Sequence, residues 1–137
     1  MQATRVGDFE VQRVTEFEGP FIAPEVFFPD FDDDYALEDG LWFESAPGHT
    51  PGNVVIHARS RDDRAVFLGD VLHHQLQLAK PEWSTLACTD RELSRKTRTR
   101  LVEEHAERGT RLFPGHFPAP TVGRIVRHGS AYRYAFE

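Results

Sequence analysis

The apolar residues of the chain recur in short runs that are separated by glycine, proline and charged residues. This pattern is typical of β-strands joined by loops. We interpret the following runs as strands: Phe9 to Phe17, with a break or bulge after Val11, Leu41 to Ser45, Asn53 to Ala58, Ala65 to Leu68 and Thr110 to Phe113. Two more runs predict a hairpin that turns at Gly129-Ser130: Arg124 to His128 and Ala131 to Phe136.

The run from Ala65 to Leu68 is apolar at every position, which predicts a strand buried on both faces. It stops at Gly69-Asp70, so the first polar group beyond a buried strand is a carboxylate. The segment before it, Arg59 to Arg64, carries charges at most positions. No core could solvate those charges together, so we predict a surface connection there.

One helix is predicted, from Thr89 to Arg108. Thr89 and Glu92 have the spacing of a capping box, and Gly109 supplies a stop signal. The apolar face is narrow and consists of Leu93, Thr97, Leu101, Val102 and His105. The opposite face, expected in water, carries Arg91, Arg95, Arg98 and Glu103. The helix should therefore cover a sheet, with His105 as a packing or surface residue rather than a ligand.

The segment from Gly19 to Phe31 combines three prolines with four phenylalanines, which predicts an aromatic-rich loop. It runs into an acidic stretch that begins at Asp30 and continues to Asp34. This stretch lacks the alternating ligands and the later glutamate of a calcium loop, so we interpret it as a solvated charge run.

Composition narrows the possible functions. The chain has 137 residues, the size of one domain, and a net charge of −6, which argues against nucleic acid or an anionic membrane as a partner. Its apolar runs are too short to cross a bilayer and no secretion signal is evident, so we expect a soluble, cytoplasmic protein. The single cysteine, Cys88, excludes an internal disulfide and is expected to be buried rather than nucleophilic.

Candidate chemistry lies in the loops that follow three strands. The stretch Glu44 to Gly52 places two glycines and two prolines around His49, which indicates a shaped loop. Asp70 and His116 likewise follow short apolar strands. Two imidazoles and one carboxylate suit Zn²⁺, Fe²⁺ or Mn²⁺. Taken singly, each has a structural alternative, since a histidine can serve a loop and an aspartate can cap a helix or turn.

Three segments together resemble the later metal-binding motifs of the metallo-β-lactamase-fold hydrolases, most closely the lactonase-like branch. They are Ala46 to Asn53, Val66 to Asp70 and Pro114 to Pro118. The likeness runs from about Leu37 to Phe136, and more weakly over Arg5 to Pro29. It implies an α/β fold, here mainly the C-terminal half of an αββα sandwich, and metal-dependent hydrolysis of lactones, esters or related small acyl compounds.

For the site, the resemblance implies that His49 binds one metal ion, Asp70 bridges two and His116 binds the other. His73 and His74 follow Asp70 closely. They could line the substrate pocket or orient the ligands, although exposed turn residues would need no such role.

The same family has an H-x-H-x-D-H motif before the position of His49, and this chain has none. No histidine precedes His49, and no two histidines are separated by one residue. The simplest interpretation is that residues 1–137 form one truncated domain that has lost an interior block near Asp30 to Tyr35. Three ligands can hold at most one metal ion per chain, so the expected hydrolytic activity is weak or absent.

Two alternatives remain from the residues. In the first, the chain is a non-enzymatic interaction or assembly module, the site loops are relics, and Phe21 to Phe31 docks on a partner. Exposed sheet edges would favour self-association. In the second, two histidines and one aspartate form the triad of an iron oxygenase, which the absence of an H-x-D pair disfavours.

Overall fold

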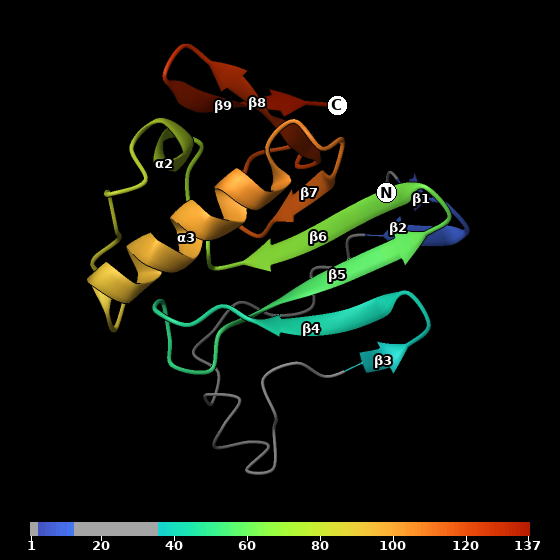
Figure 1. The fold of residues 1–137 in the computed structure, drawn as a ribbon, viewed down its shortest axis with the longest axis horizontal. Coiled ribbons are helices and arrows are strands. Elements are labelled where there is room, and N and C mark those ends of the chain that lie inside the picture. The colour runs from blue at the N-terminus through green and yellow to red at the C-terminus, as the bar shows by residue number, and fades with distance from the viewer. Residues whose placement is uncertain (1–2, 13–35) are drawn as a thin grey trace.

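The computed structural model describes residues 3–12 and 36–137, and Figure 1 shows their arrangement. The elements in chain order are β1 (Ala3–Val6), β2 (Phe9–Gln12), β3 (Ala36–Glu38), β4 (Leu41–Ser45), β5 (Val54–Ser60), β6 (Asp63–Gly69), α2 (Leu76–Ala79), α3 (Arg91–His105), β7 (Arg111–Pro114), β8 (Gly123–His128) and β9 (Ala131–Phe136). The aromatic-rich loop, the acidic run and the proposed junction at Asp30 to Tyr35 lie outside the described residues.

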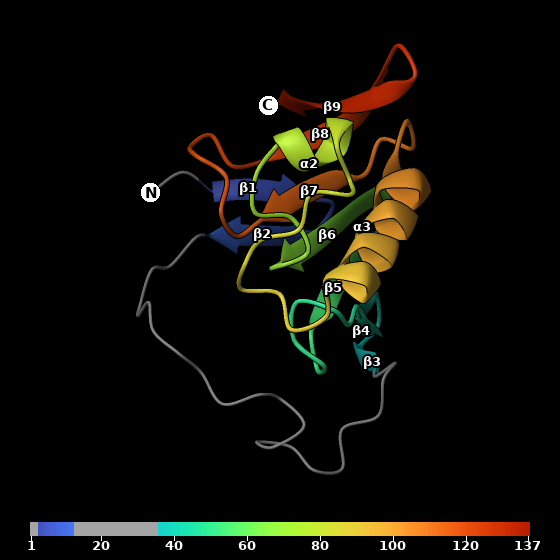
Figure 2. The ribbon, with the colours of Figure 1, turned by 90° about the vertical axis from the view of Figure 1, so that its left-hand side faces the viewer.

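A seven-stranded sheet, in the order β3-β4-β5-β6-β7-β8-β9, forms the centre of the fold. Of its neighbouring pairs, β6 and β7 are parallel and the others are antiparallel. A parallel pair needs a crossover connection, and the chain between β6 and β7 contains both α2 and α3. Figure 2 shows α3 on one face of this sheet and the β1–β2 hairpin on the other.

Two clusters of buried side chains lie on the two faces of the sheet. The larger lies on the side of the helices and joins strands β5 to β9 to α2 and α3, through Ala46, Val55, Val66, Leu68, Val71, Leu72, Leu78, Leu101, Val102, Leu112, Phe117, Ile125 and Tyr134. The smaller consists of Val6, Ala58 and Ala65, with partly buried Phe67 and Phe113 packed against it. The prediction that Ala65 to Leu68 is buried on both faces is thus confirmed, with Phe67 partly covered.

The predicted strands at Leu41 to Ser45 and Ala131 to Phe136 are confirmed, and the C-terminal hairpin pairs as expected. The prediction of a surface connection from Arg59 to Arg64 is confirmed, because its charged residues are exposed, although β5 and β6 extend into it further than expected. This segment is the end of the β5–β6 hairpin, in which Arg59 pairs with Arg64. Both arginines are exposed, so the hairpin extends while its charges stay in water.

At the N-terminus the predicted strand from Phe9 is β2, which ends at Gln12 in the described residues. Its partner β1 was not expected. The two strands pair antiparallel with Val6 opposite Phe9, and Gly7 takes a positive φ of 56° in the turn between them. A side chain there would meet Ser60, so the hairpin sits close against the end of β5.

The predicted helix exists, but its start and its outer face differ from the expectation. Its N-cap is Asp90 rather than Thr89, because the Asp90 carboxylate accepts from the backbone N–H of Leu93 at 2.9 Å. The outer face was expected to hold Arg98 in water, and this was wrong. Arg98 is fully buried, because its guanidinium donates to backbone and hydroxyl oxygens described below.

The one-turn helix α2 was not expected from the sequence. The side chain of Gln77 fixes it: its Oε1 accepts from the backbone of His73 and His74, while its Nε2 donates to Trp83 O at 2.7 Å. Neither helix in the described part of the chain combines the length and apolar composition needed to cross a bilayer.

Candidate metal centre

The His49 loop is closed at its base and docked onto the start of α3. Ala46 N donates to Asn53 O at 2.8 Å, and Asn53 Nδ2 donates back to Ala46 O at 2.9 Å. The carbonyls of Gly48 and His49 then accept from the backbone N–H groups of Asp90 and Thr89. The glycines and prolines of this loop thus serve its geometry, as the sequence predicted, and the loop presents His49 at one edge of the sheet.

Asp70 and His116 lie at the same end of the sheet because they follow two neighbouring parallel strands, β6 and β7. In the register of β6 and β7, Gly69 lies opposite Pro114, so the residues beyond each strand emerge side by side. Although the two residues are 46 positions apart, His116 Nε2 lies 2.5 Å from Asp70 Oδ1. This is a hydrogen bond between an imidazole and a carboxylate, with both side chains about half exposed.

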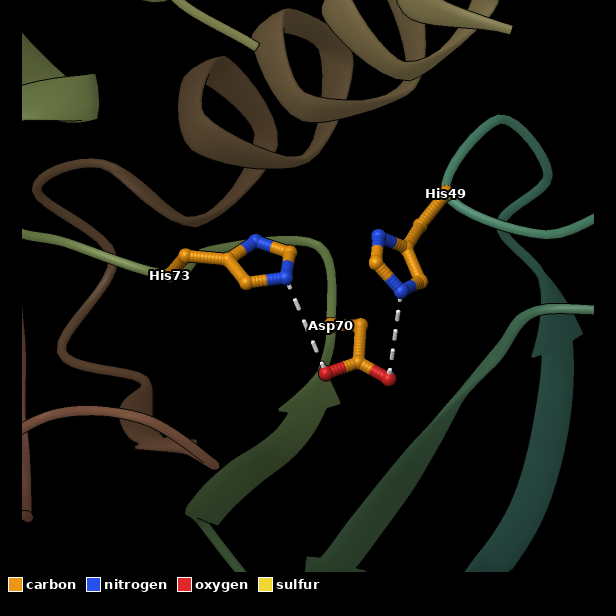
Figure 3. Close-up of side chains that lie close together, drawn as sticks. All are labelled: His49, Asp70 and His73. Carbon is orange, nitrogen blue, oxygen red and sulfur yellow. Dashed lines mark ion pairs between the residues drawn. The ribbon is translucent and has the colours of Figure 1, made fainter. Parts of the chain in front are cut away.

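Two more imidazoles face the same carboxylate, as Figure 3 shows. His49 Nε2 lies 3.8 Å from Asp70 Oδ2, and His73 Nε2 lies 3.9 Å from Asp70 Oδ1. The side chains of His49 and His73 are only 15% and 17% exposed, against 43% for Asp70. The carboxylate is therefore the most exposed member of this group, and the two imidazoles are more deeply buried.

The His73 ring lies between the other two imidazoles. It is stacked on His116, with centroids 4.7 Å apart and planes 9° apart, and tilted against His49 at 4.8 Å. Burial, together with the charges of His116 and His49, lowers the pKa of His73 to about 4, so its ring is neutral at pH 7. A neutral imidazole is the form that binds metal ions.

The residues present fit one metal ion. One ligand atom from each of His49, Asp70 and His73 can be chosen so that all three lie within 4.8 Å of one another. A tetrahedral zinc ion holds its ligand atoms about 3.3 Å apart. The three ligand atoms, now up to 4.8 Å apart, would therefore have to approach one another to bind it. In addition, Nδ1 of His73 is buried and has no hydrogen-bond partner among the described residues.

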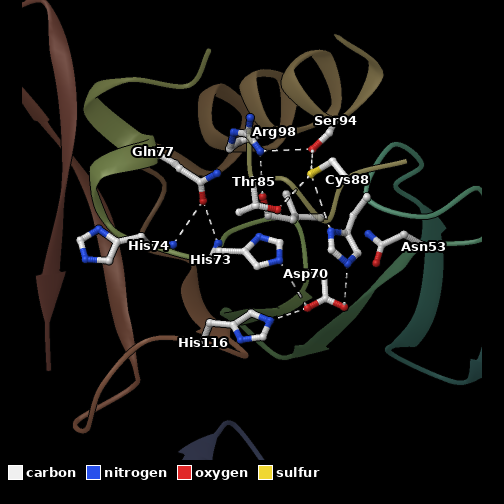
Figure 4. A network of polar contacts seen from close by, with 12 residues as sticks. Asn53, Asp70, His73, His74, Gln77, Thr85, Cys88, Ser94, Arg98 and His116 are labelled. Atoms are coloured by element: carbon white, nitrogen blue, oxygen red, sulfur yellow. Dashed lines mark hydrogen bonds and ion pairs between the residues drawn. The ribbon is translucent and has the colours of Figure 1, made fainter. Parts of the chain in front are cut away.

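A network of polar contacts around Cys88 holds the imidazole of His49 (Figure 4). Cys88 Sγ lies 3.7 Å from His49 Nδ1, and the thiol also contacts the hydroxyls of Thr85 and Ser94. Cys88 is 8% exposed, so the prediction that it is buried is confirmed. Ser94 in turn accepts from the buried Arg98, so the network continues into α3.

The structure brings together the three residues that the sequence singled out, His49, Asp70 and His116, around one carboxylate. His73, expected only to line or orient, is part of the compact group itself. His74 is not: its ring accepts from Leu76 N at 3.1 Å, and the residue is exposed. The sequence offered only one signal for His73, its closeness to Asp70. The turn after β6, which brings His73 to the carboxylate, cannot be read from the pattern of apolar and polar residues.

No protein-family model and no curated protein sequence matches the chain. Solved structures do resemble it. AidC, a dizinc quorum-quenching lactonase solved with the product N-hexanoyl-L-homoserine, is 25% identical with a TM-score of 0.71, over 78% of this chain and 37% of AidC. The hydrolase AbOPH of the β-lactamase superfamily is 24% identical with a TM-score of 0.66, over 71% of this chain and 34% of its own.

A probable metal-dependent hydrolase from Staphylococcus aureus, at 18% identity, has a TM-score of 0.65 over 78% of this chain and 39% of its own. The chain has part of the metallo-β-lactamase fold. The expected α/β class is therefore confirmed. Within this fold the chain spans less than two fifths of the length of each of the three structures.

Proposed function

We propose that this chain carries part of the metal site of a lactone- or ester-hydrolysing enzyme, and that it holds one divalent metal ion with weak or no hydrolytic activity. One observation carries the proposal: the imidazoles of His49, His73 and His116 converge on the single carboxylate of Asp70. The metals that suit this set are Zn²⁺, Fe²⁺ and Mn²⁺.

Each residue has a role in the proposed site. His49, Asp70 and His73 would hold the ion, and His116 would join them as a further ligand when its hydrogen bond to Asp70 breaks. A bound ion supplies a nucleophilic water at neutral pH and polarises a carbonyl oxygen. Until it joins, the hydrogen bond between His116 Nε2 and Asp70 Oδ1 keeps the carboxylate in place.

The segment between Asp70 and α3 supports the proposal that the substrate carries an apolar acyl chain. It carries three large apolar side chains in water: Leu76 is 53% exposed, Trp83 is 56% exposed and Leu86 is 88% exposed. Exposed large apolar side chains are typical of a surface that receives an apolar ligand. A lactone or ester with a short acyl chain would offer its carbonyl to the metal ion and its apolar chain to these residues, and hydrolysis of such a lactone yields the product bound to AidC.

The proposed low activity follows from the ligands that the chain lacks. An interior block near Asp30 to Tyr35 would supply an H-x-H-x-D-H motif, and without it two metal ions have too few ligands. Sequencing the coding DNA across this junction tests the loss of a block. An in-frame segment that encodes the motif and is skipped would make the longer product the active enzyme; a continuous coding sequence without it would contradict the skipped block.

Metal content is the direct test of the site. We expect the purified chain, incubated with Zn²⁺ and desalted, to retain about one equivalent by mass spectrometry, and His49→Ala or Asp70→Ala to retain much less. His74→Ala is the matched control, since His74 is a neighbouring histidine whose ring accepts from the backbone of Leu76 in α2 and is not part of the group around Asp70. Equal metal in the wild type and in both site variants would refute the site.

Activity is tested separately on N-hexanoyl-homoserine lactone with Zn²⁺, Mn²⁺ or Fe²⁺ supplied. We expect slow ring opening or none in the wild type, and no activity in Asp70→Ala. Ring opening that Asp70→Ala leaves unchanged would show that another site, or a contaminant, hydrolyses the lactone. Turnover equal to that of AidC would contradict the proposed weakness.

A second candidate function, assembly with further copies or another protein, is supported by the sheet edges. β3 and β9 end the described sheet and have unpaired outer sides there, with Leu37 45% exposed on β3 and Phe136 39% exposed on β9. Such edges favour strand addition. Mass in solution that rises with concentration, and that falls when Phe27 and Phe28 are replaced by serine, would favour assembly; a stable monomer would count against it.

A further inference from the structure

A second cluster of polar side chains lies on the helix side of the sheet, away from the candidate metal centre. It surrounds a cavity of about 250 Å³ between the strands β4 to β6 and the C-terminal end of α3, lined by Trp42, Glu44, His57, Arg59, Arg64 and, from the helix side, Glu104, His105, Arg108 and Thr110. Arg64 is near the start of β6 and Asp70 follows its end, so about 20 Å of extended strand separates them.

One wall of the cavity is built from paired side chains. His57 is 6% exposed and stacks flat on Trp42, with planes 6° apart and centroids 4.8 Å apart. Its Nε2 lies 2.6 Å from Glu44 Oε2. The strand register explains the stack, because Trp42 on β4 is directly opposite His57 on β5. This pairing gives the cavity a rigid aromatic wall.

Both carboxylates of the cavity are paired with the same arginine. Arg100 Nη1 lies 2.5 Å from Glu44 Oε1 and 3.4 Å from Glu104 Oε2. With His57 on its other oxygen, Glu44 has cationic or hydrogen-bonding partners on both sides. One guanidinium serves both carboxylates, so about one negative charge remains in the lining, against the positive charges of Arg59, Arg64 and Arg108.

The positive groups of the cavity, in contrast, are free. The guanidinium groups of Arg59, Arg64 and Arg108 make no ion pair or hydrogen bond with the described residues. Arg59 and Arg64 lie opposite each other in the β5–β6 hairpin, where two like charges repel. An anion between them would relieve this repulsion.

One of the lining residues, His105, also has a buried polar atom without a partner. His105 is 7% exposed, and its Nε2 has no hydrogen-bond partner among the described residues. Burial lowers the pKa of His105, so its ring is neutral at pH 7 and carries one N–H to donate. A buried unpaired ring nitrogen costs stability unless a ligand or water completes its hydrogen bonding.

We propose that this cavity binds a small molecule through a phosphate or carboxylate group, which the free arginines and the unpaired ring nitrogen of His105 would hold against the Trp42–His57 wall. Guanidinium groups bind such oxyanions strongly because they offer paired N–H donors. The volume is that of roughly eight water molecules at about 30 Å³ each, so the ligand is small. This site is independent of the candidate metal centre.

The test uses the two tryptophan indole N–H signals in NMR spectra of the full chain. Trp42 lines the cavity, whereas Trp83 is 56% exposed in the segment after α2 and serves as an internal reference. Sodium phosphate and sodium acetate are added separately, with sodium chloride at equal ionic strength as the blank. We expect a saturable shift of the Trp42 signal with at least one of the two anions and little change at Trp83.

Arginine variants locate the binding. We expect Arg108→Gln and Arg64→Gln each to weaken anion binding at least several-fold. Arg133→Gln is the matched control. It changes an exposed arginine of β9, which β7 and β8 separate from β6, and this variant should bind the anion as the wild type does. The proposal fails if neither anion gives a saturable Trp42 shift, if Arg133→Gln weakens binding equally, or if the shifts centre on the His49 loop. Thermal melts check that each variant is folded.

Discussion

The thiol of Cys88 lies 3.7 Å from Nδ1 of His49, and this contact leaves Nε2 as the ring nitrogen that faces Asp70. Groups that bond the second nitrogen of a metal-binding histidine fix its ring and commonly change metal affinity 10-fold to 100-fold. In the proposed site Cys88 is therefore a positioning residue, held by Thr85 and Ser94.

We predict that Cys88→Ala lowers zinc affinity about 10-fold, because the ring of His49 loses its support. Cys88→Ser keeps a hydrogen-bonding group and should retain most of the affinity. Competition with a fluorescent zinc chelator measures both values. If Cys88→Ala binds zinc as tightly as the wild type, the contact does not orient His49.

Gly48 is required where the His49 loop meets α3. Its φ is +128°, and a Cβ atom there would lie 2.2 Å from the backbone nitrogen of Ser94. We predict that Gly48→Ala destabilises the fold by at least about 2 kcal/mol, since both the backbone and the contact are strained. Gly129→Ala is the control, because it has a positive φ without a neighbour within 4 Å and should cost only about 1 kcal/mol. Equal urea midpoints for the two variants would contradict the close approach.

Arg98 anchors the segment that connects β6 to α3. Its guanidinium donates twice to Pro81 O, at 3.0 and 2.7 Å, and once to the hydroxyl of Ser84 at 2.9 Å. We predict that Arg98→Met lowers the free energy of unfolding by about 2 to 4 kcal/mol, because these buried acceptors lose their donor.

Arg95→Met provides the comparison for Arg98, one turn away on the same helix. Arg95 pairs with Glu92 at the surface, where water screens the ion pair, so its loss should lower the free energy of unfolding far less than the loss of Arg98. Urea unfolding of the two variants measures the difference. Similar losses would mean that the burial of Arg98 contributes nothing beyond a surface ion pair.

Acid should weaken the fold through Glu44. Its hydrogen bond from His57, together with Arg100, holds the pKa of Glu44 at about 2, below its usual 4.5, although burial opposes the shift. A carboxyl whose pKa is lowered by folding stabilises the fold fully above its unfolded pKa. This stabilisation is lost as the pH falls from about 4.5 toward 2.

We predict that Glu44→Gln removes part of the decrease in unfolding free energy over this pH range. Urea titrations at several pH values between about 6 and 2.5 measure it. Glu82→Gln, at a half-exposed surface glutamate, should leave the pH profile as in the wild type. A Glu44→Gln profile that superimposes on the wild-type profile would show that other groups cause the acid sensitivity.

The features that the sequence predicted are those set by local rules. Strands such as Leu41 to Ser45 follow from short apolar runs between turn residues, and the shaped loop around His49 follows from its glycines and prolines. The convergence of His49, Asp70 and His116 was expected because each follows a strand, although whether they bind metal stays a prediction.

The failed predictions depended on contacts between distant segments. Arg98 lies among outward-facing charges on the helix pattern, and only the path of the preceding segment brings the carbonyl of Pro81 to it. The choice of Asp90 over Thr89 as N-cap is tied to the His49 loop, whose carbonyls accept from both backbone nitrogens. The position of His73 beside His49 and Asp70 depends in the same way on a contact between segments, which the turn after β6 creates.

The parallel pairing of β6 and β7 also bears on the kinetics of folding. The β5–β6 and β8–β9 hairpins close locally, whereas β7 can join β6 only after the long connection with both helices has closed, which is entropically slower. We therefore expect Asp70 and His116 to meet only at this late step. A metal ion held there would therefore prolong the lifetime of the folded chain by slowing its unfolding, while leaving its folding rate nearly unchanged.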